Sequence, residues 1–105
     1  MGGMYSLLRR AVQARRGPFG QTVFIDADGR ELGRACPRLF GRYTVRDREG
    51  NIIGSSVRRG SDRLEHFDRD GKRVGHSVRN HFGGYTQFDE GDRVIGRMVC
   101  RRFRL

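Results

Sequence analysis

The chain has 105 residues, 22 of them basic and 12 acidic, so its formal net charge is +10. This length allows one domain with a modest core, and the 16 glycines suit short strands and turns better than a helical bundle. The sequence shows neither the apolar run of a membrane span nor that of a secretory signal. The charge favours an acidic partner: nucleic acid, anionic lipid or an acidic protein.

The first predicted element is a short helix over residues 5–16, which Gly17 and Pro18 end. A helix of this length is marginal in isolation, so we expect it to dock as a cap over the first hairpin. We accordingly divide the chain into a basic N-terminal helix or cap, residues 1–18, and a repeat domain, residues 19–105. The apolar face of the helix consists of Leu7, Leu8, Ala11 and Val12.

Residues 19–102 form four ungapped units of 21 residues. A fixed period of this length indicates a repeat architecture. Phenylalanine precedes the aspartate of a unit by seven positions at residues 19, 40 and 82, with serine at 61. The repeated positions are Asp26, Asp47, Asp68 and Asp89, and then Gly33, Gly54, Gly75 and Gly96.

Each unit has the pattern of a β-hairpin. The aspartate can accept hydrogen bonds from the backbone ahead of it, and the glycine three positions later can adopt positive φ. The predicted turns are 26–29, 47–50, 68–71 and 89–92, and we expect the last to be distorted because Asp92 replaces the glycine. The second glycine of each unit lies inside the returning strand, where it indicates a bulge or a close approach to the backbone.

An isolated hairpin is marginally stable, so the four hairpins are expected to stack. The predicted fold is all-β: four tandem 21-residue hairpins in a meander, solenoid or small barrel, with a short N-terminal helix. The returning strands are predicted to bury one aliphatic column, Leu32, Ile53, Val74 and Ile95, and beside it Val57, Val78 and Val99.

The stretch FGGYTQFD at 82–89, followed by Gly96, resembles the repeat of a group of small bacterial proteins, roughly F-G-G-Y-x-x-Y/F-D-x-x-G-x-x-x-G-x-S. The likeness extends over the four units, with Ser56 and Ser77 in the serine position. No activity is established for that group, so the resemblance implies a fold and not a function. The units are more distantly similar to MORN and choline-binding repeats. The tryptophan-rich choline box has no counterpart, because the chain lacks tryptophan.

The sequence predicts no enzyme, cofactor or metal site. The three histidines, His66, His76 and His81, occupy different repeat positions, so stacking of the units does not gather them. No serine, histidine and aspartate have the spacing of a nucleophile with its base. Cys36 and Cys100 are expected to be free thiols, as is typical of a cytoplasmic protein.

The charges predict a binding surface. Acidic residues concentrate at the hairpin turns, whereas arginines recur where one hairpin joins the next, and residues of one repeat column stack in space. Arginine suits phosphate geometry. We therefore expect a non-enzymatic module that engages an anionic partner, with nucleic acid as the leading candidate. The alternatives are a scaffold for protein interaction or self-assembly, and association of the basic helix with an anionic membrane. The predicted phosphate-binding ridge consists of Arg38, Arg58, Arg59, Arg79, Arg101 and Arg102.

Overall fold

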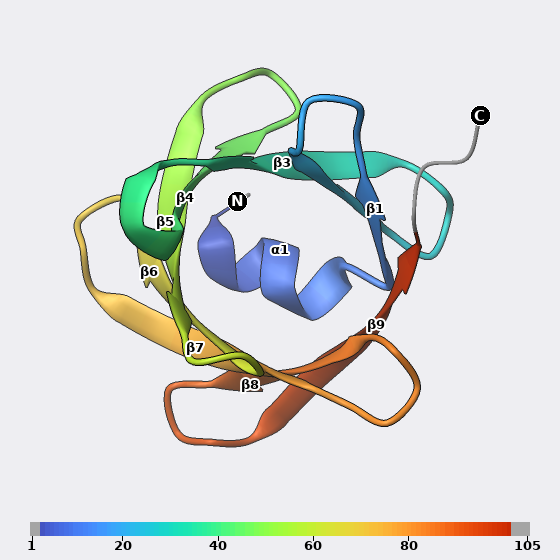
Figure 1. Ribbon diagram of the computed structural model, residues 1–105, viewed down its shortest axis with the longest axis vertical. Coiled ribbons are helices and arrows are strands. Elements are labelled where there is room, and N and C mark those ends of the chain that lie inside the picture. Colours follow the sequence, from blue (N-terminus) through green and yellow to red (C-terminus); the bar gives the residue numbers. More distant parts are fainter. Residues whose placement is uncertain (1–2, 102–105) are drawn as a thin grey trace.

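The computed structural model describes residues 3–101, which form one short helix and nine strands in a ring (Figure 1). The elements are α1 (Met4–Arg10), β1 (Gln13–Arg16), β2 (Thr22–Ile25), β3 (Glu31–Pro37), β4 (Arg42–Asp47), β5 (Ile52–Arg59), β6 (Arg63–Asp68), β7 (Arg73–Arg79), β8 (Tyr85–Asp89) and β9 (Val94–Arg101), with a 3₁₀ turn, η1 (Leu39–Gly41), between β3 and β4.

The nine strands form a closed barrel in chain order. Strands β2 to β9 are the eight strands of the four predicted hairpins, and each pairs antiparallel with the next. Strand β1 closes the ring, because it pairs antiparallel with β2 and parallel with β9. The all-β prediction and its small-barrel form are therefore confirmed.

The N-terminal prediction is wrong in its second half. The helix ends at Arg10, and residues 13–16, predicted as helix, are strand β1. The edges of β2 and β9 would otherwise carry unpaired backbone groups, and β1 satisfies both. Pairing that spans the whole chain thus overrides the local helical pattern.

The aspartate turns form as predicted. In the first, Asp26 Oδ1 accepts hydrogen bonds from the backbone N–H groups of Asp28 and Arg30, both at 2.9 Å, and Gly29 has φ +82°. The fourth turn is not distorted: Asp92 adopts φ +63° and donates to Asp89 O at 3.1 Å, as the glycines of the other turns do. The same bonds to the aspartate side chain recur there, so they hold the turn without glycine.

The predicted bulges are also present, and they shift the buried positions of the returning strands by one residue. The strand register shifts beside Leu32, Ile53, Val74 and Ile95, so each of these is the extra residue of a β-bulge. Ile53 is buried, and the other three are half-buried. The prediction for Val57, Val78 and Val99 is wrong, since the neighbouring column is the buried one: Ala35, Ser56, Ser77 and Met98.

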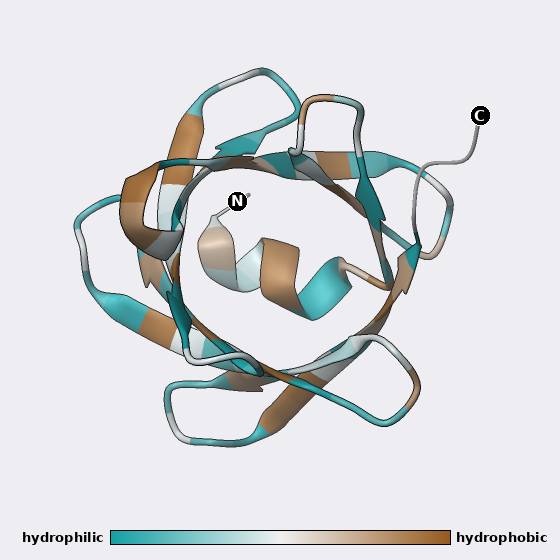
Figure 2. Cartoon of the chain, viewed as in Figure 1, coloured by the Kyte–Doolittle hydropathy of each residue, from teal (hydrophilic) through white to brown (hydrophobic). Residues whose placement is uncertain are grey.

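The helix lies inside the ring and not over the first hairpin (Figure 1). It contacts β6, β7, β8 and β9, and its buried side chains are Met4, Leu7 and Leu8. A Cβ at Gly54 would collide with Met4 and with the Phe67 carbonyl, and one at Gly33 would collide with the Arg46 carbonyl. Glycine at these positions therefore leaves room for the helix and for the backbone of the neighbouring strand. Figure 2 shows the helix surrounded by the strands, with apolar parts along its length and a hydrophilic last turn.

The barrel has two different ends. At the turn end lie the four aspartate turns, and at the link end lie the connections 17–21, 38–41, 60–62 and 80–84. Residues 3–101 include no helix with the length and apolar character needed to cross a membrane.

Candidate functional site

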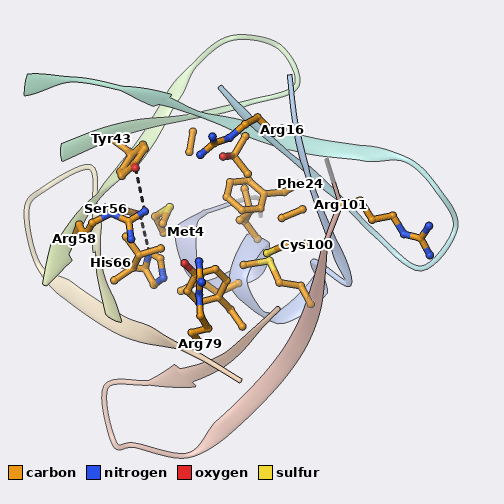
Figure 3. Close-up of a pocket in the computed structure, with 18 of the residues that line it drawn as sticks. Met4, Arg16, Phe24, Tyr43, Ser56, Arg58, His66, Arg79, Cys100 and Arg101 are labelled. Carbon is orange, nitrogen blue, oxygen red and sulfur yellow. Dashed lines mark hydrogen bonds between the residues drawn. The ribbon is translucent and has the colours of Figure 1, made fainter. Parts of the chain in front are cut away.

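The predicted ridge residues lie at the link end, but they divide between the two faces of the barrel wall. Arg58 and Arg79 line an internal cavity, whereas Arg101 borders that cavity but its side chain points away from it (Figure 3). Arg59 points to the outer face, where its Nε donates to Glu65 at 2.6 Å. Arg38 is exposed beside η1. Arg102 lies outside the described residues.

The link end concentrates positive charge. Ten of the 12 acidic residues lie in or directly beside the aspartate turns, which leaves Asp62 and Glu65 near the link end. Such a separation focuses positive potential at one end of the molecule. The arginines at or near the strand ends there are Arg15, Arg16, Arg38, Arg42, Arg58, Arg59, Arg63, Arg79 and Arg101.

Three phenylalanines project from the links at the same end. Phe19, Phe40 and Phe82 are 87%, 91% and 89% exposed, and Leu39 beside Phe40 is also exposed. Phe40 has φ +61°, which is an unfavourable conformation for an aromatic residue. Neither burial nor backbone preference explains why aromatic side chains occupy these positions.

The half of the barrel that the helix leaves open contains a cavity of about 340 Å³. Met4, Leu7 and Leu8 of α1 contribute to its lining, and Phe24 and Leu64 do so from the wall. Arg16, Arg58 and Arg79, the last or next-to-last residues of their strands, lie toward the link end. Figure 3 shows Tyr43 beside Arg58 at this cavity, and its hydroxyl accepts a hydrogen bond from Arg58 Nη2 at 3.3 Å.

A buried polar chain crosses one side of the cavity wall. His66 Nδ1 is 2.6 Å from Ser56 Oγ, and His66 Nε2 is 2.8 Å from Ser77 Oγ. Burial lowers the pKa of His66 to about 4, and the nearby charges of His76 and Arg73 act in the same direction. The imidazole is therefore neutral at pH 7, and both ring nitrogens already have partners. A pKa this far below 7 makes His66 a weak base at neutral pH.

The sequence predicted the arginine end but not its two faces. Whether Arg58 or Arg59 faces inward depends on the bulge at Ile53, which changes the alternation along β5. The phenylalanine column was visible as a repeat position and was not assigned to binding. The sequence feature that could have identified this column is an apolar residue that recurs beside glycine in the connections, outside the alternating pattern of the strands.

The predicted absence of a metal or catalytic cluster concerned His66, His76 and His81. His66 bonds to two serines, and His76 stacks on Phe88 with ring centroids 4.7 Å apart. Within residues 3–101 no three metal-ligating side chains converge. Comparison with protein-family models, curated proteins and solved structures gave no match.

Proposed function

We propose that the protein is a non-enzymatic module that binds single-stranded nucleic acid at the link end of its barrel. The observation that carries this proposal is the presence of three exposed phenylalanines, Phe19, Phe40 and Phe82, among the arginines of that end. Proteins that bind single strands combine a positive surface for the backbone with aromatic side chains on which bases stack.

The arginines supply the first part. Arg38 and Arg59 lie on the outer surface of the link end, and a guanidinium matches a phosphate with two parallel hydrogen bonds. The strong acidic clusters are at the opposite end, so a polyanion meets little repulsion at the links. Arginine makes up 21 of the 22 basic residues, and arginine also stacks on bases.

The phenylalanines supply the second part. They come from three separate links and are each surrounded by solvent, which suits stacking on individual bases. A conformation with positive φ at Phe40 costs stability, and such strain is characteristic of functional sites.

Two of the surfaces on which the alternative functions were predicted are not available, and docking of a protein partner at the exposed phenylalanines stays a second candidate. The apolar side chains Met4, Leu7 and Leu8 of the helix are buried inside the barrel, so the helix offers no apolar face to a membrane. Self-assembly through open strand edges has no free edge to use, since the described strands close on themselves. A membrane partner for the phenylalanines remains an outcome of the experiment.

The test is fluorescence anisotropy with single-stranded and duplex RNA and DNA at two salt concentrations. Single strands should bind, with a log–log salt slope of about 0.7 per phosphate contact. Arg38→Gln with Arg59→Gln should reduce the slope by about 1.4. Each Phe→Ser change at 19, 40 or 82 should weaken binding about fivefold or more, the value of one stacked base.

The matched control is Arg48→Gln with Arg69→Gln, which removes the same charge from exposed positions at the turn end. It should leave the slope nearly unchanged. Absence of oligonucleotide binding at low salt overturns the proposal. Binding to anionic vesicles that is lost in the phenylalanine variants, without oligonucleotide binding, would identify a membrane surface instead.

A further inference from the structure

We propose that the barrel interior is a second binding site, for a small anionic ligand with an apolar body, such as a short-chain carboxylate. The cavity of about 340 Å³ between α1 and the link end would hold the body, and the arginines at its mouth would hold the anion. This site is separate from the outer surface proposed to bind nucleic acid.

The cavity is open because its wall positions carry small side chains. Ala35, Ser56 and Thr22 point into space that larger residues would fill. Protein interiors are normally close-packed, and an unfilled apolar volume reduces stability. A volume of this size lies at the lower end of the range for small-molecule sites, roughly 300–1,000 Å³.

The walls nearest the helix are apolar. Met4, Leu7, Phe24, Leu64 and Met98 all contribute to the lining. The buried polar groups of this lining, Ser56 and His66, are hydrogen-bonded to each other, and His66 also bonds to Ser77. The inner part of the cavity therefore favours binding of an apolar group.

The arginines at the mouth of the cavity determine which ligand charge is favoured. Arg16, Arg58 and Arg79 line this mouth, and no aspartate or glutamate of the described residues lines the cavity. Arg58 bonds to the Tyr43 hydroxyl, which raises its pKa, and Arg79 lies over the Tyr85 ring at 5.9 Å. Within residues 3–101 none of these three arginines has a carboxylate within salt-bridge distance. Three cations with no carboxylate partner at the mouth favour an anion.

Arg58 and its neighbour Arg59 provide a matched pair. They are adjacent in β5, but Arg58 faces the cavity whereas Arg59 binds Glu65 on the outer surface. Loss of the first should weaken the cavity site alone, and loss of the second should weaken nucleic-acid binding alone. Failure of one proposal is thereby distinguishable from failure of the other.

The experiment is isothermal titration calorimetry of the full chain with octanoate, 1-octanol and octylammonium, three probes of similar length and different charge. Octanoate should bind most tightly and octylammonium least. Arg58→Gln should weaken octanoate binding about tenfold, in line with loss of one charge-assisted hydrogen bond, and should leave octanol unaffected. Arg59→Gln should leave all three unchanged.

A second variant, Ala35→Leu, narrows the cavity and should weaken octanoate binding in a protein that keeps its circular dichroism spectrum. Should that variant fail to fold, the methyl NMR signals of Met4 and Met98 in the unaltered protein decide, since both side chains line the cavity and should shift on octanoate addition. Equal binding of the three probes, absence of octanoate binding, or unshifted methyl signals would overturn the proposal.

Discussion

At the scale of single residues, the same inward position of the barrel is occupied in four different ways. The four units place Phe24, Val45, His66 and Gln87 at one repeat column. Gln87 is fully buried and its Nε2 donates to the Leu8 carbonyl at 3.1 Å and the Ala11 carbonyl at 3.4 Å, at the end of the helix. The four similar hairpins thus enclose an asymmetric interior, because a single helix cannot make the same contacts with all four of them.

His66 makes stability depend on pH. Its pKa is about 4 in the folded protein, mainly through burial, and about 6.5 in an unfolded chain. Between these values unfolding takes up a proton, so this contribution is complete above about pH 6.5 and is lost as the pH falls toward 4. The full span corresponds to about 3 kcal/mol. Urea unfolding at pH 7 and pH 5 should show the decrease, and His66→Gln should reduce it.

His76 provides the comparison for that measurement. Burial, together with Arg63 and Arg73, also lowers its pKa, so His76→Gln should remove only part of the decrease. The backbone hydrogen bonds to Asp26 and Asp89 lower their pKa values below the usual range, so neither carboxylate titrates between pH 7 and 5. An unchanged decrease in His66→Gln would show that His66 does not cause it.

At the scale of elements, α1 is stable because the barrel surrounds it. Seven residues are too few for a stable isolated helix. Inside the barrel, the buried side chains of α1 form part of the hydrophobic core. Leu8→Ala should therefore lower the free energy of unfolding by about 2–4 kcal/mol, since Leu8 is 2% exposed. Tyr5→Ala, on the exposed side of the same helix, should cost less than about 1 kcal/mol. Equal costs in urea unfolding would contradict the internal position of the helix.

The sequence predicted those elements whose cause is local. An aspartate that binds the backbone ahead of it and a glycine at positive φ determine each turn, and the strand glycines predicted the bulges. What the sequence did not predict depends on distant pairing. Residues 13–16 carry no strand pattern, and become β1 because β2 and β9 both need a partner. The inward orientation of Arg58 likewise depends on a bulge whose register was not evident.

At the scale of the whole molecule, the ring has one seam unlike the others. All pairs from β1 through β9 are antiparallel, and only β1 with β9 is parallel. Strand β1 has four residues, whereas β5 and β9 have eight each. Parallel pairing is slightly less stable per residue. This pairing also joins the first strand of the chain to the last. The seam is therefore the place where the barrel should open first.

Hydrogen exchange measured by mass spectrometry tests this order of opening. Amides of β1 should exchange faster than those of β6, because local opening of the seam exposes β1 while the central hairpins remain paired. The pair of β8 with β9 supplies an internal control, since its antiparallel bonds should persist when β1 detaches. Equal protection of β1 and β6 would mean that the ring opens only when the whole molecule unfolds. Faster exchange confined to β1 and to the β9 amides that face it, such as that of Val99, would identify this seam as the weakest pairing of the barrel.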